Sequence, residues 1–271
     1  MIDDLRHLDE TSNKLLKGGH VKEAIDCFDL ALQRRKELLG PTSHAFHLSC
    51  LNLAATFMQI AMDPNHSMTK RSRISLLSRA EELSQNSDSS KVTVWYNLAK
   101  LYQLENDLNL AYKYLKMALV TQSRLRGIKD RRISIDMHLN MSSILSRSNK
   151  HKMALRHART ALALTEGCLA NEKKQHISCA EHNDGREDSI NCNTTSDNAN
   201  RNWSEILAIS FYNVGTQYEH LKDFKASRYA YECGAKVASL LGDDKDIKKK
   251  LEVASKHLKE RSIDKLATNN H

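Results

Sequence analysis

The stretch that decides the fold is Trp95-Tyr96-Asn97-Leu98-Ala99-Lys100-Leu101-Tyr102. Its pattern is an asparagine, an apolar residue, a small residue and, three places further on, a large apolar residue. The same pattern starts at Asn52, Asn140 and Asn213, so the four asparagines are separated by 45, 43 and 73 residues. The last interval is one period plus a polar insertion. Internal repetition with this period predicts a stack of similar structural units.

A second block of small and large residues follows each of these four stretches at a nearly fixed offset, and a weaker first copy of the block lies behind Ser12, Asn13 and Leu15. The block in the second copy aligns only after about seven extra residues near Asp63. Small residues seven apart, with a large residue between them, let a neighbouring helix approach one face closely. Each helix pair then has an apolar face that only stacking can bury. In order along the chain, the five blocks are Ala24/Phe28/Ala31, Arg73/Leu77/Ala80, Ala111/Leu115/Ala118, Ala154/Ala158/Ala161 and Ser227/Tyr231/Gly234.

The composition favours long helices joined by short turns. Only two prolines and nine glycines occur in 271 residues, and the chain is 40% hydrophobic and 27% charged. The pattern predicts an all-α, right-handed α-solenoid of about five helix pairs, with a capping helix over 243–266 that turns Ile247, Leu251, Ala254 and Leu258 inward. Polar composition predicts a mobile, disordered insertion over 170–202. The expected pairs are 2–39, 43–85, 90–126, 130–169 and 203–241.

These residues resemble the tetratricopeptide repeat (TPR). The third copy is the best match, and the fifth copy matches through Phe211, Gly215, Tyr218, Phe224 and Tyr231. The period near 43 exceeds the usual 34 residues, and with the run from Ala31 to Pro41 it is similar to the long-helix repeats of kinesin light chains. The resemblance covers most of residues 5–241, with repeats one to four in 1–169 and the fifth in 203–241. It implies a protein-binding solenoid and does not identify a partner.

In TPR proteins, the position of the repeated asparagine faces the concave groove. The resemblance therefore implies that Asn52, Asn97, Asn140 and Asn213 line such a groove. An amide both donates and accepts hydrogen bonds, so a ladder of asparagines could hold the backbone of an extended peptide. The alternative is that each asparagine bridges adjacent helices. Further residues are predicted on the same side of the first helices and so in the candidate groove: Asn13, Tyr96, Lys100, Arg147, Tyr212 and Thr216.

Charge favours an acidic protein partner. The formal net charge is +8, but basic and acidic residues are interleaved, which is typical of a solvated helical surface. Lys100 and Arg147 are the fixed positive charges of the candidate groove, and an acidic segment would suit them. Some TPR proteins clamp the carboxyl terminus of heat-shock chaperones, but here Asp9 replaces the expected lysine of the first repeat. Basic runs lack interleaved aromatic residues, so nucleic acid is not an expected partner.

No motif for catalysis, a cofactor or a metal is found. The sequence has no phosphate-binding loop, no nucleophile elbow and no zinc-protease helix. His176, Cys179, His182 and Cys192 lie in the polar insertion without the paired spacing of a structural zinc site. The beginning of the chain shows no signal peptide and no apolar stretch of membrane-spanning length was found, so a cytoplasmic chain is expected.

The leading hypothesis is a non-enzymatic interaction scaffold or adaptor that binds an extended segment of a partner in its concave groove. The alternative is a structural subunit of a larger ciliary or cytoskeletal assembly, which would use its convex face and ends. The oligomeric state is left open by the sequence.

Overall fold

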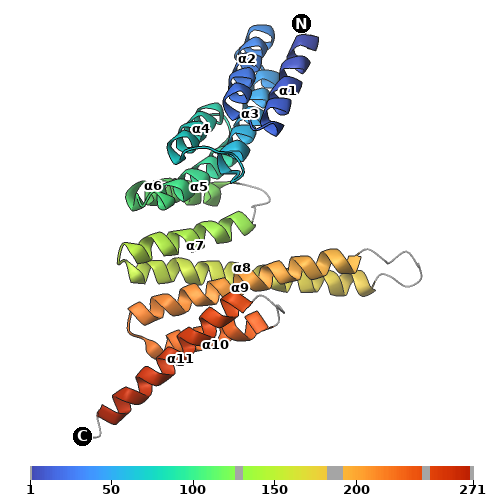
Figure 1. The fold of residues 1–271 in the computed structure, drawn as a ribbon. Coiled ribbons are helices and arrows are strands. Elements are labelled where there is room, and N and C mark those ends of the chain that lie inside the picture. Colours follow the sequence, from blue (N-terminus) through green and yellow to red (C-terminus); the bar gives the residue numbers. More distant parts are fainter. Residues whose placement is uncertain (1, 126–130, 182–191, 240–244, 269–271) are drawn as a thin grey trace. The chain divides into compact units, whose positions relative to one another are not determined.

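The structure is a computed structural model that describes residues 2–125, 131–181, 192–239 and 245–268. At residues 2–3, 172–181, 192–202, 245 and 259–268 it describes only the helical backbone. The described residues form eleven α-helices and no strand (Figure 1). They divide into two compact units, residues 1–129 and 130–271.

The first unit contains three helix pairs. Within it, each helix packs against its pair partner, α2 also contacts α3, and α4 also contacts α5. The first helices of the second and third pairs, α3 and α5, contact one another as well. The helices are α1 (Ile2–Lys17), α2 (Val21–Leu39), α3 (His44–Met62), α4 (Lys70–Leu83), α5 (Asp88–Leu104) and α6 (Leu108–Arg124).

The second unit contains two helix pairs and a final helix. Its first helices α7 and α9 contact one another, α8 packs on both of them, and α11 packs on α9 and α10. The predicted all-α repeat of five helix pairs with a capping helix is therefore confirmed. The helices are α7 (Arg131–Arg147), α8 (His151–Glu181), α9 (Cys192–His220), α10 (Phe224–Ser239) and α11 (Lys245–Thr268).

Polar side chains fix where several helices begin. The oxygens of Ser43, Thr69, Ser87 and Asp107 each accept a hydrogen bond from a backbone N–H in the first turn of the following helix. The turns inside the third, fourth and fifth pairs each contain one residue with a positive φ. Those residues are Asn106, Asn149 and Lys222, with φ values of 64°, 56° and 64°.

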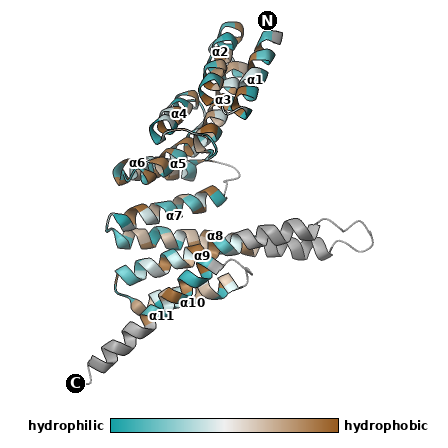
Figure 2. Cartoon of the chain, viewed as in Figure 1, coloured by the Kyte–Doolittle hydropathy of each residue, from teal (hydrophilic) through white to brown (hydrophobic). Residues whose placement is uncertain are grey.

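The core lies where the repeat predicts it. Ala111, Leu115 and Ala118 are completely buried, and so are Ala154, Ala158 and Ala161. Individual helices have hydrophobic and hydrophilic faces, as expected for amphipathic helices that cover a thin core (Figure 2). By length and composition the helix α3 is long and apolar enough to cross a membrane, which corrects the expectation that no apolar stretch has that length. Its residues Leu53 and Phe57 belong to the core that it shares with its neighbours in the first unit.

The extra residues of the second pair form the connection between α3 and α4, where Arg73 organises the backbone. The Nη1 atom of Arg73 donates to the carbonyl oxygens of Ala61 and Asp63 at 2.6 and 2.8 Å. Its Nη2 atom donates to the carbonyl oxygen of His66 at 2.7 Å. In the first copy, the residue aligned with Arg73 is the small residue Ala24. The arginine is therefore present in the copy that has the longer connection, whose backbone it bonds.

The capping helix agrees with the prediction, whereas the polar segment between α8 and α9 differs from it. The capping helix begins at Lys245, and Leu251 and Leu258 are buried against α9 and α10 as predicted. In the polar segment 170–202, however, α8 continues to Glu181 and α9 begins at Cys192. Residues 182–191 lie outside the described residues. Because a helix satisfies its own backbone hydrogen bonds, polar composition alone did not determine where α8 ends and where α9 begins.

Candidate functional site

The buried small residue of each first helix sets the register of the candidate groove. In α3, α5, α7 and α9 this residue is Ala54, Ala99, Ser142 or Gly215, and the repeated asparagine lies two places before it. In α1 the buried small residue is Ser12, whose exposed fraction is 0%. The α1 residue in phase with Asn52 is therefore Glu10. Asn13 lies three places further on and is exposed.

Asn52 lies in a polar cleft between α1 and α3. The cleft has a volume of about 260 Å³, and Asp9, Arg35, Ser49 and Thr56 contribute polar side chains to it. Asp9 of α1 and Arg35 of α2 form an ion pair along this cleft, so Asp9 holds an arginine at the position where a chaperone clamp would have a lysine. The exposed amide of Asn52 makes no hydrogen bond with the described residues, so it is available to a ligand.

On α5, three candidate residues lie within one helical turn of each other. The ammonium group of Lys100 lies 5.5 Å from the centre of the Tyr96 ring, at cation–π distance. Lys100 is exposed and forms no ion pair with a carboxylate among the described residues. The half-buried amide of Asn97 forms no hydrogen bond there either. Because α3 contacts α5, Asn52 and Asn97 lie on adjacent first helices of one unit.

The equivalent asparagines of the second unit already have interactions. The side-chain amide of Asn213 donates to the carbonyl oxygen of Ile209 at 2.9 Å, one turn earlier in α9. Asn140 on α7 also takes part in a contact of its own. The Asn213 bond stays within α9, so it is not the bridge between adjacent helices that was the alternative to groove binding. Arg147 is exposed in the last turn of α7.

The structure brings Tyr212 and Thr216 together with residues of α10 and the end of α9. The phenol oxygen of Tyr231 lies 3.1 Å from Oε2 of Glu219 and 3.3 Å from Oγ1 of Thr216. The ring centres of Tyr212 and Tyr231 are 5.7 Å apart. Burial raises the pKa of Tyr231, and the nearby Glu219 carboxylate raises it further, so the phenol stays protonated. The sequence pattern did not reveal Glu219 as a member of this cluster.

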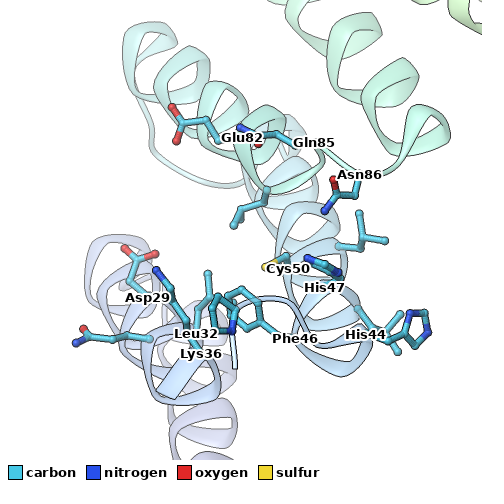
Figure 3. A pocket seen from close by; sticks show the side chains of 15 residues that line it. Asp29, Leu32, Lys36, His44, Phe46, His47, Cys50, Glu82, Gln85 and Asn86 are labelled. Carbon is cyan, nitrogen blue, oxygen red and sulfur yellow. The ribbon is translucent and has the colours of Figure 1, made fainter. Parts of the chain in front are cut away.

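A larger cavity lies between the first two pairs of the first unit. Its volume is about 760 Å³, and residues of α2, α3 and the end of α4 line it (Figure 3). Leu32 and Lys36 come from α2, while Phe46, His47 and Cys50 come from α3. An ion pair from Asp29 of α2 to Arg79 of α4 holds the two pairs together beside the cavity. The cavity shows that α2 covers only part of the surface that α3 and the end of α4 turn towards the first pair.

In the part of the chain that the structure describes, no group of three or more histidine, cysteine, aspartate and glutamate residues could hold a metal ion. The side chains of His176, Cys179, His182 and Cys192 lie outside that part.

The comparisons with known proteins bear on the fold alone. No protein-family model matches the sequence, and no curated protein matches it. Among solved structures, BtubC (BKLC) from P. vanneervenii is 16% identical and covers 88% of this chain and 81% of its own, with a TM-score of 0.55. A putative kinesin light chain of Podosopora anserina with TPR-like repeats is 14% identical and covers 89% of this chain and 98% of its own, with a TM-score of 0.44. The MamA protein is 14% identical and covers 87% of this chain and 96% of its own, also with a TM-score of 0.44. The likeness to BtubC, together with the five helix pairs of the described chain, gives a TPR-like repeat fold.

Proposed function

We propose that this TPR-like chain is a protein-interaction scaffold that binds an extended peptide segment along the surface of α3 and α5. The observation that carries the proposal is the pair of amides at Asn52 and Asn97. They occupy equivalent positions on adjacent helices and have no hydrogen-bonding partner among the described residues. A primary amide can donate to a peptide carbonyl and accept from a peptide N–H, so it can hold a backbone of any sequence.

Charge beside the amides favours an acidic segment. Lys100 presents an ammonium group without a carboxylate partner in the described part of the chain, next to the ring of Tyr96. By contrast, Arg35 in the cleft near Asn52 is neutralised by Asp9. An acidic side chain of the peptide would therefore pair with Lys100, while Tyr96 provides an apolar surface beside it.

A selected peptide can test this proposal. A display library of acidic extended peptides would be screened against the full chain, and the affinity of one selected peptide would be measured by fluorescence anisotropy. Replacing Asn52 and Asn97 together by alanine should weaken binding by about tenfold, because two hydrogen-bonded amides are lost. Circular dichroism would show that the helices are retained.

Asn213→Ala provides the matched control. The Asn213 amide is already bonded to its own helix, so its loss should leave the affinity for the peptide unchanged. A double variant of Asn52 and Asn97 that binds the selected peptide as tightly as the original chain would refute the proposal. A Lys100→Ala variant should lower the affinity only for peptides that contain a carboxylate.

A structural role in a larger assembly is a second candidate. It is favoured by Leu30 and Leu38 on α2, large apolar side chains with exposed fractions of 44% and 38%. Cross-links to native partners that involve only the ends and the outer helices, and not Lys100, would support this role over peptide binding.

A further inference from the structure

Helix α8 carries a row of positive charges that no acidic residue accompanies. Between Asp136 and Glu166 the sequence has five lysines and arginines and no aspartate or glutamate, whereas the two signs are interleaved over most of the chain. Of these five, Lys152, Arg156 and Arg159 are exposed on α8. Their spacing of four and then three residues places them on successive turns of one face. We call these three residues the basic row of α8.

The basic row borders an open hollow in the second unit. The hollow has a volume of about 650 Å³, and among the described residues only α8 lines it, from Lys152 to Leu164. This part of α8 is about 18 Å long, so the hollow follows the helix for several turns. Leu155 and Leu164 provide apolar surface in it, and both are half-buried because they also pack against the core. The hollow therefore combines a line of cations with fixed apolar side chains.

The cations of the basic row form no ion pair with any carboxylate in the described part of the chain. A comparison between copies of the repeat gives the reason. On α2 the residue equivalent to Arg159 is Asp29, which pairs with Arg79 on α4, the second helix of the following pair. On α10 the residue equivalent to Arg79 is Cys233, which supplies no carboxylate. The positions that bond α2 to its neighbour thus leave α8 with unmatched positive charge.

Packing of the repeat does not require cations at these positions. The equivalents of Lys152 include Asn109 on α6, and Glu166 ends the row two turns beyond Arg159. Acidic, neutral and aromatic residues are all found at the other two positions. The equivalents of Arg156 and Arg159 are Asp26 and Asp29 on α2, Ser75 and Ser78 on α4, Lys113 and Lys116 on α6, and Tyr229 and Glu232 on α10.

We propose that the basic row binds an acidic amphipathic helix of a partner protein, which lies along α8 with its carboxylates on the three cations. Charge complementarity selects the acidic partner. Helical geometry selects the conformation, because side chains on one face of a helix recur about every 5.4 Å, the same pitch as the basic row. In an extended chain, side chains on one side are about 6.8 Å apart and lose step with the row. Apolar side chains of the partner would enter the hollow beside Leu155 and Leu164.

A nucleic acid and a membrane fit the hollow less well. No aromatic side chain is found among the described residues that line it, so bases have no ring on which to stack. Leu155 and Leu164 are half-buried in the wall, and they are placed to receive a side chain rather than to enter a bilayer.

The probe for this site is a peptide selected from a display library of amphipathic helices, with glutamates at i, i+4 and i+7 beside a row of leucines. The peptide is selected on a full chain in which Asn52 and Asn97 are alanine, so the result does not depend on the surface of α3 and α5. Arg156→Glu with Arg159→Glu should weaken binding at least about tenfold in fluorescence anisotropy, because two attractive pairs become repulsive.

The matched control is Lys113→Glu with Lys116→Glu on α6. These exposed residues occupy the equivalent positions and change the net charge equally, so the affinity should stay the same. Circular dichroism would show that both double variants keep their helices. A library that yields no binder, or a selected peptide whose affinity does not depend on Arg156 and Arg159, would overturn the proposal.

Further probes test the kind of partner. A proline in the central turn of the selected peptide keeps its charge but breaks its helix, so binding should be lost. A single-stranded oligonucleotide and phosphatidylserine vesicles should not distinguish the original chain from the variant with glutamates at Arg156 and Arg159. Undiminished binding of the proline peptide would overturn the proposal, and so would an oligonucleotide or vesicles that lose their binding in that variant.

Discussion

The ring of Tyr231 occupies the space that a side chain at Gly215 would need. A Cβ atom on Gly215 would lie 2.5 Å from Cε1 and 2.6 Å from Cδ1 of Tyr231. In the third pair, the residues at the positions of Gly215 and Tyr231 are Ala99 and Leu115, and both are buried. The fifth pair thus combines a larger residue on the second helix with a smaller one on the first.

Gly215→Ala should destabilise the second unit by about 1–3 kcal/mol, because the Tyr231 ring must move out of a packed core. Adding Tyr231→Leu should recover part of that loss, since the pair then matches Ala99 and Leu115. Thermal and urea unfolding of the single and double variants would measure the coupling. Simply additive effects of the two changes would contradict this explanation.

Arg73→Lys should loosen the connection between α3 and α4. A lysine cannot reproduce the guanidinium, which donates to three carbonyl oxygens at 2.6 to 2.8 Å. We expect a loss of roughly 2 kcal/mol in the free energy of unfolding. Limited proteolysis should show faster cleavage between Asp63 and Thr69. The exposed neighbour Arg71 provides the control, since Arg71→Lys should change neither measurement.

Ser142→Ala should stabilise the second unit. The hydroxyl oxygen of Ser142 is buried without a hydrogen-bonding partner, whereas the equivalent residues Ala54 and Ala99 have no hydroxyl. Removing an unsatisfied buried group should raise the free energy of unfolding by about 1 kcal/mol. Denaturant unfolding would measure the change. Ser143→Ala, at a half-buried position that does have a contact, should not stabilise the chain.

Acid should destabilise the contact between α7 and α8. The Nδ1 atoms of His138 and His157 lie 2.9 Å apart, which requires one ring to donate and the other to accept. Burial, and then the charge of His157, lowers the pKa of His138 from 6.5 to about 4, and burial lowers the pKa of His157 as well. The unfolded chain therefore binds protons first as the pH falls, and stability decreases through the window from 6.5 to about 4.

The expected loss is roughly 2 kcal/mol, allowing for the partial exposure of both rings. Unfolding curves across that pH range would measure it. His138→Gln should flatten the pH dependence in this window, because glutamine does not titrate. His257→Gln, a change of an exposed residue on α11, should leave the dependence as it is. A His138→Gln variant with the original pH dependence would contradict the assignment.

Most of the fold could be predicted from the sequence, because small and large residues at fixed offsets determine which helical faces pack. The buried residues Ala111, Leu115 and Ala118 show this directly. The pattern was less informative in the first copy. There Ser12, not Asn13, provides the register, because a buried small residue is required at the helix contact while the exposed position is not constrained.

The candidate groove could be predicted only in part. Equal spacing placed the four asparagines on four first helices, but spacing carries no information about hydrogen-bond partners. The Asn213 amide is bonded to Ile209, whereas the amides of Asn52 and Asn97 remain unbonded within the described chain. The ion pair between Asp9 and Arg35 joins residues from two helices, and no local pattern indicates it.

The incomplete coverage of the second pair by α2 has a consequence for hydrogen exchange. Among the described residues, the backbone of α1 does not approach that of α3, whereas α3 packs on α5 and α7 packs on α9. The backbone of the first pair approaches that of the second through α2, beside a cavity of about 760 Å³. Its amide protons should exchange through a separate opening of low free energy, so α1 and α2 form the least protected cooperative unit of residues 1–129.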